Sequence, residues 1–188
     1  MSTRTRIPRL ALIAAIAAVA AAGTFCCADP APAADTVVVA VNAKDGSFLY
    51  RVRLDVRRVV GSTVDETNAA VALASCDSCE TVAVSIQALL VFTTPTVATP
   101  TNLAIAMNVD CSACQTLASA YQLYLQTGGP AHFTADGNRQ IAQIRRELEA
   151  IRHAGLTIWE IQADVDRLAN ELLAVLQNEL VAAGRAGG

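Results

Sequence analysis

The chain has 188 residues, of which 53% are hydrophobic and 16% charged, and these proportions exclude intrinsic disorder over most of its length. The formal net charge of −3 argues against non-specific nucleic-acid binding, and the length favours a single domain. Aromatic residues make up only 4%, so we expect a core built mainly from Ala, Val, Leu and Ile.

The segment 1–34 has the features of a Sec-type export signal. Three arginines precede an apolar run over 10–22, and small residues then lead to candidate cleavage sites after Ala28, Ala33 or Ala34. The apolar run is short for a transmembrane helix, and an uncleaved anchor is the alternative interpretation. We therefore predict a secreted or cell-envelope protein that has no stable membrane insertion after cleavage.

A β-hairpin is predicted at the start of the exported part. Residues 37–41 are rich in valine, Asp45-Gly46 is a turn signal, and residues 50–57 alternate between apolar and polar side chains. The polar side of the second strand carries Arg51, Arg53 and Arg57. This arginine stripe is either a solvated strand face or a surface for an anionic partner.

An internal repeat follows, with copies at 67–90 and 101–125. Residues before the cysteines match at a shift of 34, and residues from the cysteines onward match at a shift of 35, so one residue is inserted before Cys111. Each copy reads as strand, CxxC turn, strand, although the last segment of the second copy also suits a helix. Pro and Gly residues separate these units, and the β-rich part spans 35–130.

The segment 131–183 is predicted to form a helical hairpin. Isoleucine and leucine recur at helical spacing over 141–151, and Thr157 with Glu160 forms a capping box that begins a second helix. The apolar stripe over 158–176 is either core against the sheet or a coiled-coil seam. In the latter case Trp159 is the expected anchor for a protein partner, or for self-association through these helices. The tail 184–188 is expected to fray.

Four cysteines of the exported part are the candidate site residues: Cys76, Cys79, Cys111 and Cys114. In an exported chain they favour two disulfides, for which three connectivities are open; we prefer the two local bridges. The alternatives are one zinc ion held by four thiolates, or redox-active thiols. The acidic neighbours Asp77, Glu80 and Asp110 disfavour both alternatives, so no cofactor is expected.

Sequence motifs for catalysis are missing from the chain. It has no HExxH, GxSxG, P-loop or GxGxxG pattern, and an enzymatic activity is therefore uncertain and not favoured. His132 is predicted in a loop, and His153 near a helix C-terminus suits dipole compensation better than catalysis. Gln87 and Gln122, at equivalent repeat positions, are expected to satisfy buried backbone groups.

The doubled CxxC and the Asn-centred strands at Asn68 and Asn102 resemble an uncharacterised actinobacterial secreted domain. That domain also occurs as the extracytoplasmic tail of membrane proteins similar to peptide zinc metalloproteases. The resemblance covers about 36–180 and implies export and an envelope setting, but it implies no activity and no catalytic residue.

From these observations we predict an α+β domain. Its antiparallel sheet of about six strands derives from the duplicated strand–CxxC–strand unit, and a helical hairpin follows. The predicted function is that of an exported, disulfide-stabilised, non-enzymatic interaction or structural module.

Overall fold

The computed structural model describes residues 35–183, so the predicted export signal and the predicted frayed tail lie outside the described residues. The strands are β1 (Thr36–Asn42), β2 (Phe48–Val59), β3 (Thr63–Val64), β4 (Thr67–Ala74), β5 (Glu80–Val91), β6 (Val97–Ala98), β7 (Thr101–Asn108), β8 (Gln115–Gln126), β9 (Ala131–Phe133) and β10 (Leu180–Ala182). The helices are α2 (Ala135–Ala150), the short 3-10 helix η1 (Ile151–His153) and α3 (Ile158–Asn178).

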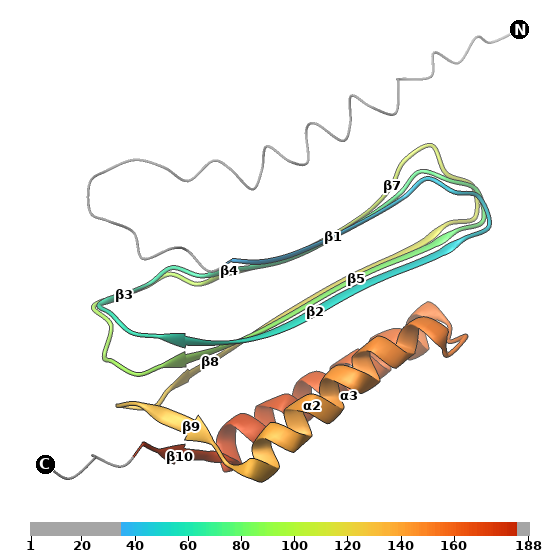
Figure 1. The fold of residues 1–188 in the computed structure, drawn as a ribbon. Helices are drawn as coiled ribbons and strands as arrows, with labels where there is room; N and C mark the ends of the chain where they lie inside the picture. The colour runs from blue at the N-terminus through green and yellow to red at the C-terminus, as the bar shows by residue number, and fades with distance from the viewer. Residues whose placement is uncertain (1–34, 184–188) are drawn as a thin grey trace, which may run out of the picture. The chain divides into compact units, whose positions relative to one another are not determined.

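Six of the strands form two stacked, parallel sheets (Figure 1), with strand orders β1-β4-β7 and β2-β5-β8. The chain passes from a short strand in one sheet, through a tight turn, to a long strand in the other sheet, and it makes this path three times in all. We call these three passes rung 1 (36–59), rung 2 (67–91) and rung 3 (101–126). The architecture is a three-rung parallel β-solenoid that carries a helical hairpin.

The prediction of an antiparallel sheet is wrong, because every pairing within these two sheets is parallel. The predicted hairpin of 37–41 with 50–57 is wrong for the same reason, since β1 pairs with β4 and β2 pairs with β5. The Asp45-Gly46 turn connects the two layers instead of two neighbouring strands. The central strands β4 and β5 are buried on both faces, as parallel strands usually are.

The two copies of the sequence repeat lie on rungs 2 and 3. Asn68 pairs with Asn102, a shift of 34, whereas Glu80 pairs with Gln115, a shift of 35. The extra residue of rung 3 falls between these pairs, where Asp110 has a positive φ of 47°. Rung 1 is a third copy that the sequence analysis did not recognise.

A C-terminal helical hairpin is present, as predicted. Thr134 caps α2, and the predicted capping box of Thr157 and Glu160 begins α3. Two short strands that were not predicted, β9 and β10, pair in an antiparallel manner beside the hairpin. They join the start of α2 to the end of α3.

The main core lies between the two helices and the sheet β2-β5-β8 (Figure 1). Its fully buried members include Ile86 from β5 and Leu168 and Leu172 from α3. The hydroxyl of Tyr50 donates a hydrogen bond of 3.0 Å to the carbonyl oxygen of Leu148, which ties β2 to α2. The apolar stripe of α3 therefore packs against the sheet of its own chain, while Trp159 lies off this stripe and is 80% exposed.

Candidate functional site

The four candidate cysteines meet at the turns of rungs 2 and 3. Cys76 is paired with Cys79, and Cys111 with Cys114, each pair at disulfide distance with Cα atoms 6.0 Å apart. This is the local connectivity. The first pair is almost fully buried, and the second pair, on the last rung, is partly exposed.

Stacking of the rungs brings the two pairs into contact. The sulfur atoms of Cys79 and Cys114 are 3.7 Å apart, and those of Cys79, Cys111 and Cys114 all lie within 4.8 Å of one another. Among residues 35–183 these three sulfurs are the one convergent group of metal-ligating side chains. Tetrahedral zinc with four thiolates places neighbouring sulfurs about 3.8 Å apart, so these three sulfurs, once reduced, would suit three of the four positions around that ion.

The same turn geometry occurs on all three rungs, because the backbone adopts the left-handed conformation at one equivalent position. That residue is Gly46 in rung 1, Ser78 in rung 2 and Ala113 in rung 3, with φ of 63°, 51° and 56°. Rung 1 has no cysteines there. Instead, the hydroxyl of Ser47, which stands at the position of Cys79, donates a 2.7 Å hydrogen bond to the carbonyl oxygen of Lys44.

Acidic groups surround these turns, as the sequence indicated. The Asp77 carboxylate accepts hydrogen bonds from the backbone N–H of Ser112 at 3.0 Å, and the Asp45 carboxylate accepts one from the backbone N–H of Asp77 at 2.9 Å. These bonds align consecutive rungs. The negative charge of the two carboxylates also opposes ionisation of a neighbouring thiol, since a thiolate gains stability from positive neighbours.

A first polar ladder crosses the interior of the solenoid. The side-chain amide of Asn68 donates to Asn102 Oδ1 at 2.8 Å and to the carbonyl oxygen of Tyr121 at 3.0 Å. Its Oδ1 accepts a 2.6 Å hydrogen bond from the Ser85 hydroxyl. Asn68 and Ser85 are fully buried, so this ladder binds the layers together and is closed to a substrate.

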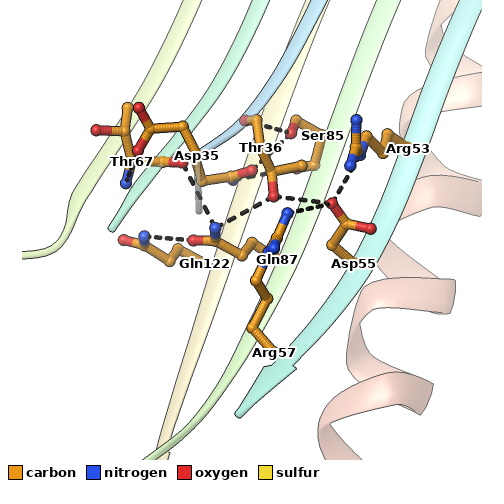
Figure 2. Close-up of polar contacts among 10 residues, drawn as sticks. Asp35, Thr36, Arg53, Asp55, Arg57, Thr67, Ser85, Gln87 and Gln122 are labelled. Carbon is orange, nitrogen blue, oxygen red and sulfur yellow. Dashed lines mark hydrogen bonds and ion pairs between the residues drawn. The ribbon is translucent and has the colours of Figure 1, made fainter. Parts of the chain in front are cut away.

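A second polar ladder ends in charged groups at rung 1 (Figure 2). Gln122 donates to Gln87 Oε1 at 2.8 Å, Gln87 donates to Thr36 Oγ1 at 3.1 Å, and Thr36 donates to Asp55 Oδ2 at 3.1 Å. Both glutamines also donate to backbone carbonyl groups, Gln122 to Glu66 and Gln87 to Thr67, as the sequence analysis expected.

Asp55 ends this ladder as a carboxylate. Partial burial pushes the pKa of Asp55 upward, but hydrogen bonds from Arg53 and Thr36, and the charges of Arg53 and Arg57, outweigh burial and hold the pKa below its usual value. The nearest oxygen–nitrogen distances are 2.6 Å to Arg53 and 3.3 Å to Arg57. The arginine stripe is therefore partly engaged with its own aspartate.

A third polar cluster connects α3 to the outer face of β8. The Tyr121 hydroxyl donates to the Asp166 carboxylate, and the Gln162 amide donates to the Tyr121 oxygen at 2.8 Å. The Ser119 hydroxyl donates to Gln162 Oε1 at 2.7 Å. Burial, followed by the hydrogen bond to Asp166, raises the pKa of Tyr121 to about 12, so the phenol stays protonated and serves as a donor.

The two histidines lie apart from the cysteines. His132 is in β9, where its neighbour across the pair is Val181, and His153 ends η1. Neither histidine belongs to the sulfur cluster. Within the described residues, no helix is both long and apolar enough to cross a membrane.

Comparisons with known proteins found no matching family model, no matching curated protein and no matching solved structure.

Proposed function

We propose that the protein is an exported, disulfide-braced, non-enzymatic interaction module. The observation that supports this most is the pair of CxxC turns on adjacent rungs, each closed by its own local bridge, because cysteines persist as disulfides in oxidising compartments. Such bridges brace a small three-rung stack whose interior is rich in alanine. The export signal inferred from residues 1–34 agrees with this setting.

The polar groups inside the solenoid support a structural role over catalysis. Asn68, Ser85 and Gln87 are 0% exposed, and their hydrogen bonds join one rung or layer to the next. The lowered pKa of Asp55 makes this carboxylate a poor proton acceptor near neutral pH. An interaction module needs a stable scaffold that presents an exposed surface, and the hydrogen-bonded rungs supply that scaffold.

A second function is supported by the 3.7 Å separation of the Cys79 and Cys114 sulfurs. If the cysteines are reduced in the cell, the converging sulfurs of Cys79, Cys111 and Cys114 supply three ligands of a zinc site, with Cys76 as the candidate fourth, or a thiol-redox site. The acidic residues beside the turns weigh against it, because they add negative charge next to four thiolates.

The intact mass of the exported protein decides between the two functions. The chain is expressed with residues 1–188 in a secreting bacterial host and purified from the medium. It is then labelled with an alkylating reagent under denaturing conditions, with and without prior reduction. We expect a chain processed near residue 34 that takes up no label before reduction and four labels afterwards.

Two results would overturn the first proposal in favour of the second. One is uptake of four labels without reduction, and the other is a native mass that is heavier by one zinc ion. A variant with Cys111→Ser and Cys114→Ser is the matched control, since it should take up two labels after reduction and should bind no zinc. Retention of the unprocessed chain inside the cells would contradict export.

A further inference from the structure

The two ends of the three-rung stack differ in charge. At rung 1, the inner positions of β2 hold Arg51, Arg53 and Asp55, and inward-pointing charges are a known device that stops a sheet edge from pairing with another chain. At rung 3, neither β7 nor β8 contains a single charged residue. The inner alanines Ala104 and Ala106 of rung 3 are exposed.

The backbone at the open end of rung 3 is ready for a further pairing. In β7, the N–H of Thr101 points toward rung 2 and donates to the carbonyl oxygen of Glu66. In β8, the N–H of Gln115 donates to the carbonyl oxygen of Cys79. Successive residues of a strand direct their backbone N–H and C=O groups to opposite sides. The even-numbered residues of β7 and β8 therefore direct these groups outward, away from rung 2. Among the described residues, no strand pairs with this side.

We propose that a second copy of this chain covers the open end of rung 3. This inference rests on the proposed function, because it names the partner of the interaction module. A two-fold axis parallel to the strands swaps the two layers and keeps each residue at its height along the strand. It therefore places β7 of one copy antiparallel beside β8 of its partner, and β8 beside the partner's β7.

The sequence of rung 3 suits this arrangement. Within rung 3, Asn108 of β7 lies opposite Thr116 of β8, and the two side chains are hydrogen-bonded. Because the two strands run in opposite directions, a step of six residues along each places Asn102 opposite Gln122. Across the two-fold axis, Asn102 then meets the partner's Gln122, and Ala104 meets the partner's Ala120. The members of each pair match in polarity, an amide with an amide and an alanine with an alanine. All of these residues are even-numbered, so their outward N–H and C=O groups face each other.

The helices favour an axis along the strands over other two-fold axes. Because α3 packs over β8, an axis perpendicular to the sheets would bring two α3 helices closer than the 8–10 Å that helix packing allows. Swapping the layers instead places α3 beside the bare outer face of the partner's β7.

One rim of α3 is suited to this contact with the partner. Trp159 and Leu173 are 80% and 37% exposed, and their helical spacing places them on the same side as Gln162, which bonds Ser119 of β8. Leu103, on the outer face of β7, is 38% exposed. The proposed dimer lines these apolar side chains up along each of the two paired edges, with the partner's Leu103 at a level between Trp159 and Leu173.

The expected size of the contact is that of a specific dimer. Eight residues of strand extend about 27 Å, and two layers about 10 Å apart with their side chains give a footprint of roughly 500 Å² per copy. With the α3 rim added, the total exceeds the ~1,000 Å² that a biological interface needs. Stacking of rung 3 on another copy's rung 1 would give an open filament instead, and the charges of rung 1 oppose that contact.

Sedimentation equilibrium of the exported, purified protein tests the proposal. We expect twice the chain mass at tens of micromolar. Ala104→Arg introduces at rung 3 the kind of inner charge that rung 1 carries, at an exposed position that the monomer tolerates. It should give the chain mass alone. Because dimerisation itself stabilises the folded chain, the melting temperatures of the variant and the wild type should converge as the protein concentration is lowered. Val39→Arg, at a 47% exposed position on the outer face of β1, is the matched control and should remain dimeric.

An engineered disulfide tests the geometry independently. Thr101 and Leu123 are on the outer faces of opposite layers within one copy, but the two-fold axis brings Thr101 beside the partner's Leu123. The variant Thr101→Cys with Leu123→Cys should form a covalent dimer on a non-reducing gel, whereas each single variant should not.

Three results would overturn the dimer: a monomeric wild-type protein at 100 µM, larger polymers, or a dimer that Ala104→Arg leaves intact. If the mass and labelling measurements still show export and two disulfides in that case, the proposed function stands and only this partner is refuted.

Discussion

Substituting Asn68 by alanine should destabilise the fold far more than the same substitution at its repeat equivalent, Asn102. Asn68 is fully buried in rung 2, and its side chain makes hydrogen bonds to Asn102, Tyr121 and Ser85 at 2.6–3.0 Å. Each lost hydrogen bond costs about 1 kcal/mol, so we expect a loss of about 3 kcal/mol in the free energy of unfolding. Part of this loss arises because the partners remain buried.

Asn102 is the internal control for this prediction. It occupies the same position on rung 3, but it is exposed. Its Oδ1 accepts the 2.8 Å hydrogen bond from Asn68, and its N–H donates one of 2.9 Å to the Ala120 carbonyl oxygen. Water can replace much of what Asn102→Ala removes, so the expected cost is about 1 kcal/mol or less.

Urea unfolding followed by far-UV circular dichroism measures both variants under the same conditions, at a low protein concentration where the chain is monomeric and Asn102 faces water. The Asn68→Ala variant should also melt roughly 10 °C below the wild type, since 1 kcal/mol corresponds to about 2–4 °C for a chain of this size. Equal losses for the two variants would refute the reasoning, because they would show that burial of the ladder does not set its contribution.

Three further predictions concern other parts of the fold. Ser78→Gly should stabilise the protein by about 0.5 kcal/mol in urea unfolding, because serine has a φ of 51° there and glycine adopts this conformation without steric cost. Leu168→Ala should cost about 3 kcal/mol, since Leu168 is 0% exposed, whereas the volume-conserving Leu168→Met should cost under about 1.5 kcal/mol in the same assay. Because the pKa of Asp55 is lowered in the folded state, its ionised form stabilises the fold above the usual aspartate pKa, and this contribution disappears as the pH falls through the lowered value. The difference in unfolding free energy between wild type and Asp55→Asn should therefore be constant from pH 5 to 7 and shrink below about pH 4.

The helical hairpin could be predicted from the sequence, because apolar periodicity and the capping box at Thr157 act locally. The local pairing of the cysteines was also predictable, since residues three apart across a turn lie at bridging distance. The parallel sheets were missed although the repeat contained the signal. Two copies of strand–turn–strand that stack position on position are parallel, whereas alternation of apolar residues within one strand carries no information about its neighbours.

Rung 1 escaped recognition because its ladder residues differ from those of the other two copies. Thr36 stands where the other rungs have Asn, Asp55 stands where they have Gln, and the shift to rung 2 is 32 residues. Its position at an end of the stack permits the change, because an end rung is open to water on one side and can hold charged groups that the interior cannot. The contact between the two cysteine pairs followed from the same stacking and was equally hidden.

The placement of the covalent bridges within rungs, and not between them, determines how the molecule would respond to force. Each bridge joins cysteines three residues apart, so it withholds only a few residues from extension. A pull on the two ends would meet resistance from hydrogen bonds between rungs and from the helical core, and the rungs would then peel away one at a time. With about 3.4 Å gained per released residue, the protein would act as an extensible tether whose turns stay closed while its sheets open.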